Sequence, residues 1–198
     1  MKASAKKALA RYWPAYLASL VLLPLFSYEL VEQIQKPKNE ETISIFIGSI
    51  SSDVSAAKKM LNENKPDYLL EINIFSYSYL ESTFATYYSA SGKEGADLII
   101  LPESKIVDVT VFSYYSPLDE AHSSSDDYVI EDNGKHYGKL LRKKGEDFSW
   151  LSVSDESHDE NYYAFFGKGS LHAGSVNGNS CETSFLFLSL LQNKNNEA

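Results

Sequence analysis

Apolar positions in the middle of the chain recur first with a period of two and then with a helical period. Isoleucine occupies every second position from 43 to 47, which predicts a β-strand that ends near Gly48. A polar run at residues 51–53 is suited to cap a helix, and apolar side chains then recur at positions 54, 57, 60 and 61. The pattern predicts a strand and then a helix that ends before Pro66.

The same alternation of strand and helix continues for two further steps. Residues 69–75 and 96–101 are rich in branched and aromatic side chains and predict two more strands, separated by a helical pattern at residues 79–90. The run at 96–101 is apolar almost throughout, as in a strand covered on both faces. Because strands joined by helical crossovers pair in parallel, we expect an α/β fold with a doubly wound, mostly parallel sheet.

The second half of the chain gives shorter and less regular signals. Residues 109–115 predict a further strand or extended segment, and residues 128–130 and 137–141 flank a turn with the sequence Asp-Asn-Gly, which is typical of a β-hairpin. Residues 143–161 are charged and poor in aliphatic side chains, which indicates an exposed loop. A buried strand at 162–166 and a closing amphipathic helix at 181–192 complete the predicted elements.

Before the domain lies an uncharged apolar run from residue 12 to residue 28. At about 1.5 Å per residue it spans roughly 25 Å as a helix, and residues to position 31 extend it by a turn. Four basic residues precede the run, so the positive-inside rule keeps them in the cytoplasm. We expect a cytoplasmic tail at 1–11, a transmembrane signal anchor at 12–31, a tether at 32–41 and an extracytoplasmic domain at 42–198 of a single-pass cell-membrane protein.

A cleaved secretory signal is the main alternative to this anchor, because a basic start and an apolar run occur in both. A cleavable signal needs small residues near its end, whereas residues 25–29 are bulky or charged apart from Ser27. We therefore favour retention of the anchor over cleavage, and both over a core helix of a cytosolic protein.

Charge narrows the list of partners. The net charge is -9, and without the four basic residues of the tail it is about -13. Nucleic-acid affinity depends on neutralising phosphates with Lys and Arg, so nucleic acid is excluded as an expected partner. The expected partner of residues 12–31 is the lipid bilayer itself.

Four segments of the domain together resemble a known family. They are ADLIILPES at 96–104, YSPLDE at 115–120, VIEDNGKHYGKLL at 129–141 and YYAFFGKGSLHAG at 162–174. The chain resembles the first lobe of bacterial extracellular solute-binding proteins, the binding subunits of ABC importers, over about 150 residues. The last segment is similar to the strand with which such chains return to the first lobe, which implies one lobe of a periplasmic-binding-protein-like fold.

The chain departs from this family in one respect that affects function. Family members have two lobes that close around the ligand, whereas here only residues 142–161 lie between the hairpin and the returning strand. The resemblance therefore implies an accessory or sensing component and not a complete solute clamp. A single wall cannot bury most of a small ligand's surface. The alternative that we keep open is a protein-interaction module on the same fold with no small-molecule ligand.

Motifs that carry chemistry are absent from the sequence. There is no G-x-S-x-G, no P-loop and no G-x-G-x-x-G, and the histidines at 122, 136, 158 and 172 lack the spacing of a helical metal site. Ser170 and His172 are close in sequence, and we interpret them as local hydrogen-bonding residues. The single cysteine, Cys181, cannot form an internal disulfide. We expect no enzyme activity, no catalytic residue, no metal and no cofactor.

The predicted topology nevertheless gives a candidate binding site. In open α/β sheets ligands bind beyond the carboxyl ends of the strands. The polar side chains at those ends are Ser49, Ser51, Ser76, Tyr77, Glu103 and Ser104. Hydroxyls, one carboxylate and one ring suit a small polar solute, a peptide, or the loop of a membrane protein or transporter subunit.

Overall fold

The structure, a computed structural model, divides the chain into two units, Met1–Lys38 and Asn39–Ala198. It describes residues 12–13, 17–24, 37–50, 53–106, 111–118, 128–146, 159–173 and 183–193. In the first unit, residues 12–13 and 17–24 are helical. No helix in these described ranges has the length and apolarity needed to cross a membrane. The predicted tail at 1–11 and much of the predicted anchor and tether lie outside the described residues.

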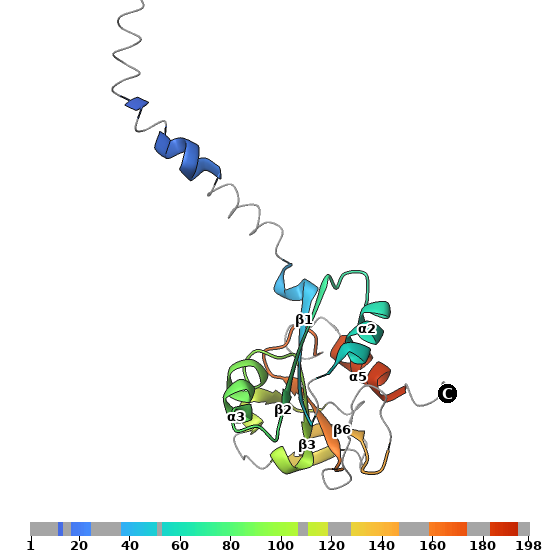
Figure 1. The fold of residues 1–198 in the computed structure, drawn as a ribbon. Helices are drawn as coiled ribbons and strands as arrows, with labels where there is room; N and C mark the ends of the chain where they lie inside the picture. The colour runs from blue at the N-terminus through green and yellow to red at the C-terminus, as the bar shows by residue number, and fades with distance from the viewer. Residues whose placement is uncertain are drawn as a thin grey trace, which may run out of the picture. The chain divides into compact units, whose positions relative to one another are not determined.

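The second unit is built on one seven-stranded sheet (Figure 1). Its strands are β1 (Thr42–Ser49), β2 (Glu71–Ser78), β3 (Leu98–Pro102), β4 (Tyr115–Ser116), β5 (Tyr128–Asp132), β6 (Lys135–Arg142) and β7 (Tyr162–Gly167). They lie in the order β2-β1-β3-β7-β6-β5, and β4 pairs with β7 outside this path. The three strands predicted first are therefore neighbours at one end of the sheet.

The strand direction reverses between β3 and β7, so the expectation of a mostly parallel sheet was wrong. β1 is parallel to both β2 and β3, as the helical crossovers predict. The other four pairs, β3–β7, β4–β7, β5–β6 and β6–β7, are antiparallel, so the sheet is mixed. The tight turn at Asn133 and Gly134 makes β5 and β6 antiparallel. The ion pair of Arg142 with Asp159 places the end of β6 beside the start of β7, so these two strands also run in opposite directions.

Helices cover both faces of the sheet. On one face lie α2 (Ser55–Glu63) and α5 (Thr183–Asn193), and on the other lie α3 (Phe84–Tyr87) and the π-helical turn η2 (Tyr88–Gly92) (Figure 1). Short helical turns, η1 (Asn39–Glu41), η3 (Glu103–Lys105) and α4 (Val111–Tyr114), lie beside β1, β3 and β4. The predicted α/β class is confirmed, with helices on both sides of a mixed sheet.

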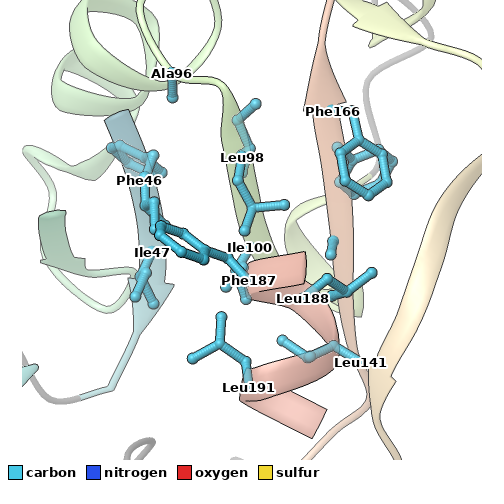
Figure 2. Packing of buried hydrophobic residues seen from close by; sticks show 14 of the residues in the cluster. Phe46, Ile47, Ala96, Leu98, Ile100, Leu141, Phe166, Phe187, Leu188 and Leu191 are labelled. Carbon is cyan, nitrogen blue, oxygen red and sulfur yellow. The ribbon is translucent and has the colours of Figure 1, made fainter. Parts of the chain in front are cut away.

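The core lies on both faces of the sheet, because successive side chains of a strand point to opposite faces. β3 and β7 are buried at every position, because they lie in the middle of the sheet with both faces covered. Side chains of α5 point toward the sheet, and Figure 2 shows Phe187 near Ile100 of β3 and Leu188 beside Leu141 of β6. All four of these side chains are buried.

Local sequence signals explain the hairpin and two differences from expectation. The turn between β5 and β6 has Asn133 and Gly134 at φ values of 52° and 74°, the left-handed conformations of the predicted Asn-Gly turn. The helix expected from residue 79 begins only at Phe84, because the Tyr79 N–H donates to the Ser49 carbonyl and keeps the chain beside β1. Of the extended segment expected at 109–115, the described part is helical at 111–114 and extended only at Tyr115.

Candidate functional site

The carboxyl ends of β1 and β2 bring two of the predicted site residues together. Ser49 and Ser76 lie on the same face of adjacent strands, and their hydroxyl oxygens are 3.4 Å apart. Ser49 is buried and Ser76 is half-buried. The third predicted serine, Ser51, lies outside the described residues. This part of the site presents two hydroxyls that are already in contact with each other.

Tyr77 lies on the opposite face of β2 and belongs to an aromatic cluster. Its ring stacks on Tyr87 of α3 with centroids 4.1 Å apart and planes at 6°, and it also contacts Phe46 at 5.7 Å. Tyr87 is 40% exposed, whereas Tyr77 is half-buried. The ring that is more accessible to a ligand is therefore Tyr87, which sequence reasoning did not identify because it belongs to a helix and not to a strand end.

Glu103 and Ser104 follow β3 and form the first two residues of η3. The Glu103 carboxylate accepts a hydrogen bond of 2.8 Å from the Asn161 side-chain amide. The Ser104 N–H and hydroxyl both donate to the carboxylate of Glu160, at 2.7 Å and 3.0 Å. Because β7 runs antiparallel to β3, the residues before β7 necessarily lie at the carboxyl end of β3. Glu160 and Asn161 thereby join the predicted site.

Tyr79 connects the two halves of this edge. Its N–H donates to the Ser49 carbonyl at 3.0 Å, and its hydroxyl lies beside the Glu160 carboxylate that holds Ser104. Burial, and then the negative charge of Glu160, raise the pKa of Tyr79 to about 12. The Lys105 ammonium lies 5.7 Å from the centre of the Tyr79 ring. A chain of contacts thus runs from Ser49 through Tyr79 and Glu160 to Ser104.

A buried arginine holds together the ends of the segment between β6 and β7. Arg142, the last residue of β6, forms an ion pair of 2.7 Å with Asp159 and donates to the Glu146 and Glu160 carbonyls at 2.7 Å and 3.0 Å. The Gly145 N–H donates to the second Asp159 oxygen at 2.7 Å. We call these contacts of Arg142 the arginine clasp, and the predicted site at the carboxyl ends of the strands the carboxyl-end site. Because the Glu160 carboxylate also accepts hydrogen bonds from Ser104, the arginine clasp helps to hold the carboxyl-end site in place.

The carboxyl ends of the strands present hydrogen-bonding groups and one exposed aromatic ring, that of Tyr87. Ser49 is buried, so the Ser76 hydroxyl, which donates and accepts, and the exposed Glu103 carboxylate, which only accepts, are the groups that a ligand can reach. These groups match the hydroxyl, amide and ammonium groups of polar solutes or peptides. In the described parts of the chain, no three His, Cys, Asp or Glu side chains gather as a metal site.

Two cavities lie at the opposite edge of the sheet, at the amino ends of β1 and β3. Their volumes are about 270 Å³ and about 410 Å³, and both are lined by Gly95, Asp97 and Gly169. The Asp97 carboxylate accepts from the Ser44 N–H at 2.8 Å and from the Ser170 hydroxyl at 2.6 Å. This carboxylate therefore fastens the turn after β7 to the start of β1.

Ser170 and His172 also hold the turn after β7 against the start of β1. The Ser170 oxygen accepts from the His172 N–H at 3.0 Å, while His172 Nε2 lies 2.9 Å from the Thr42 carbonyl. Because a carbonyl only accepts, Nε2 is the donor in this bond. Both residues are buried. The prediction that they make local hydrogen bonds is confirmed.

Of the predicted site, Ser49 and Ser76 are brought together, Glu103 and Ser104 are adjacent, and Tyr77 faces the other side of the sheet. Sequence reasoning missed Tyr79, Tyr87, Glu160 and Asn161. The last two carry one signal in the sequence, since they directly precede the strand predicted at 162–166. Their place beside β3 depends on the antiparallel pairing.

Comparisons with known proteins give a distant likeness. No family model matches the chain, and no curated protein matches its sequence. The maltose/maltodextrin-binding domain MalE from Bdellovibrio bacteriovorus, bound to maltotriose, is 19% identical over 50% of this chain and 28% of its own, with a TM-score of 0.34. A cyclo/maltodextrin-binding protein complexed with maltotetraose is 17% identical over 54% of this chain and 29% of its own, with a TM-score of 0.37.

The chain thus spans less than a third of the length of either structure. Each likeness extends over about half of this chain.

Proposed function

We propose that the chain is a membrane-anchored extracytoplasmic binding protein, an accessory or sensing component related to the solute-binding proteins of ABC importers. The observation that carries this proposal is the run of contacts along the carboxyl ends of the strands, from Ser49 through Tyr79 and Glu160 to Ser104. Fixed hydroxyls and carboxylates at such an edge are groups with which open α/β sheets bind polar ligands. The ligand class is a small polar solute or a short peptide.

The arginine clasp limits how much of a ligand's surface the carboxyl-end site encloses. Arg142 and Asp159 hold the two ends of the 143–158 segment together at the point where a two-lobed relative would leave the first lobe. Only one wall then contacts the ligand, and most of its surface stays in water. This predicts weak binding, which fits a sensing role or a site that a second subunit completes.

Variants of the full chain test the site. Maltotriose, single amino acids and tripeptides serve as probes, and binding is measured by calorimetry. Glu103→Gln removes the exposed acceptor charge and is expected to weaken binding of a probe that donates to it by about tenfold, the loss of one charged hydrogen bond. The matched control is Glu94→Gln, an exposed glutamate that lines a cavity at the opposite edge. Equal losses in both variants would contradict the site.

Membrane topology is tested separately. Residues 12–31 are proposed to hold the protein in the membrane with the tail of residues 1–11 in the cytoplasm, because the basic residues precede the apolar run. Mass spectrometry of membrane-extracted protein is expected to find the N-terminus intact. A mature N-terminus between about residues 25 and 40 would indicate a cleaved signal.

A protein-interaction module without a small ligand is the second candidate. The observation that favours it is a set of exposed apolar side chains on and beside β2: Phe75, Leu80 and Tyr87. Exposed apolar patches mark surfaces that other proteins cover. If none of the probes binds, and a membrane partner is retained by Glu103→Gln as well as by the unaltered chain, this candidate replaces the solute-binding proposal.

A further inference from the structure

Strand β2 lies at one end of the sheet, and among the described residues only one of its two sides has a partner strand. It pairs over all eight residues with β1, without a register shift, and with no other strand in the part of the chain that the structure describes. Alternate residues of an edge strand direct their backbone N–H and C=O groups away from the sheet, where they need partners. At about 3.3 Å per residue, β2 offers an edge of about 26 Å.

The sequence of β2 carries none of the usual protections of an exposed edge. It reads EINIFSYS, with no proline, glycine, lysine or bulge, and its one charge is Glu71 at the first position. Natural proteins normally blunt edge strands with such features to prevent pairing with another chain. The strand at the other end of the path, β5, is only five residues long and ends in two acidic residues. β2 is therefore the edge suited to accept a further strand.

Apolar side chains accompany this edge. Phe75 is 37% exposed on the face that carries α3, and Tyr87 of α3 is 40% exposed and stacks on Tyr77, two positions after Phe75 on the same face. Leu80, just after the strand, is 53% exposed. A strand laid beside β2 would place every second side chain over this face. Alternating apolar residues in the added strand would therefore cover Phe75 and Tyr87.

Charge indicates which kind of strand fits. Glu71 and Glu81 are exposed at or just beyond the two ends of the edge. Lys65 lies near the start of the edge, and its ammonium donates to the Leu70 carbonyl at 2.7 Å. The chain as a whole has a net charge of -9. An acidic strand would be repelled both locally and at a distance, whereas basic residues at the ends of a strand would meet Glu71 and Glu81.

We propose that the open edge of β2 binds an extended segment of a partner protein, with alternating apolar side chains and basic ends, by adding it to the sheet as an eighth strand. Main-chain hydrogen bonds to β2 supply much of the affinity, and contacts with Phe75 and Tyr87 select the side chains. This surface is the edge of the sheet and differs from the carboxyl-end site proposed above.

The test uses the full chain and two nine-residue peptides of alternating Val and Thr, one with Lys and one with Glu at both ends. Amide hydrogen exchange is followed residue by residue. The Lys-ended peptide is expected to slow exchange at alternate positions from Glu71 to Ser78, and to bind at least about tenfold more tightly than the Glu-ended one at low salt. A Lys-ended peptide with proline in the middle is expected to lose binding, because proline cannot donate to the edge.

Phe75→Lys is expected to abolish binding of the Lys-ended peptide by removing an apolar contact and adding a like charge. Leu186→Lys is the matched control, since Leu186 is also apolar and is 41% exposed on α5. The proposal is overturned if β2 exchange is unchanged by either peptide, or if the control loses binding equally. It is also overturned if the β2 edge is already protected in the free chain, by one of its own segments or by a second copy as shown by concentration dependence. Because Glu103→Gln does not touch this edge, failure here leaves the solute-site test standing.

Discussion

Arg142 and Asp159 form an ion pair of 2.7 Å between the end of β6 and the approach to β7, with side chains that are 4% and 17% exposed. The guanidinium also donates to two backbone carbonyls, so its charge is matched by three acceptors. Lys144 N–H adds a hydrogen bond of 2.9 Å to the Asn161 side chain. The two strands are thereby joined at the base of the intervening segment.

Removal of Arg142 is expected to destabilise the domain more than removal of the Asp159 charge. Arg142→Leu leaves the Glu146 and Glu160 carbonyls without their donor and leaves Asp159 without its partner, which should lower the unfolding midpoint by about 5 °C or more. Asp159→Asn keeps the size of the side chain and removes only the charge. Thermal unfolding followed by circular dichroism gives both midpoints. Equal midpoints for the two variants would contradict the role of the carbonyl contacts.

The same ion pair predicts a dependence on acid. The hydrogen bond from Arg142 holds the pKa of Asp159 below its ordinary value of 3.8. The stability that this carboxylate contributes is therefore complete above pH 3.8 and is lost as the pH falls toward the lower pKa of the folded state. The difference in midpoint between the unaltered chain and Asp159→Asn should be constant from about pH 5 to 8 and shrink in more acidic buffer. A difference that grows with acid would contradict the assignment.

The raised pKa of Tyr79 predicts that the stability of the protein falls as the pH rises in the alkaline range. Its pKa is raised to about 12 by burial and by Glu160, so the folded state keeps the phenolic proton longer than the unfolded chain does. Its contribution to stability is complete below about pH 10 and is lost as the pH rises toward 12. NMR of ¹³C-labelled tyrosine measures the titration directly. Glu160→Gln should lower the pKa of Tyr79 but leave it above 10, because burial is the larger cause, whereas Glu94→Gln should leave it unchanged.

Gly167, the last residue of β7, and Gly169, in the turn that follows, give a matched pair of positions at the amino ends of β1 and β3. A methyl group on Gly167 would lie 2.2 Å from the Ala96 carbonyl oxygen, which is part of the backbone and cannot move aside. A methyl group on Gly169 would have no atom within 4 Å apart from those of its chain neighbours. Gly167→Ala is therefore expected to lower the free energy of unfolding by about 1–3 kcal/mol, and Gly169→Ala to change it little. Chemical denaturation measures both. Similar effects of the two substitutions would show that the close approach is not needed.

The strands and the hairpin could be predicted because their signals are local. Alternating isoleucines mark β1, and Asn133 with Gly134 marks the turn before β6. The partner of β7 could not be predicted in this way, because a run of buried residues is compatible with any central position in a sheet. The expectation of a mostly parallel sheet failed at this strand.

The same limit applies to the candidate site. Ser49 and Ser76 come together because parallel strands end at one edge, which the βα pattern predicts. The contact of Ser104 with Glu160 joins residues 56 positions apart through the antiparallel return of β7, and no local pattern encodes it. The stacking of Tyr87 on Tyr77 depends on where α3 begins, which differs from the start predicted for that helix.

Affinity measures the central claim, a binding site with one wall, most directly. Calorimetry of the full chain against maltotriose, amino acids and tripeptides is expected to give dissociation constants no tighter than the micromolar range, about -8 kcal/mol, because a single wall leaves most of a small ligand in water. The tightest probe should lose affinity in Glu103→Gln and retain it in Glu94→Gln. A nanomolar dissociation constant for the isolated chain would contradict the one-walled site.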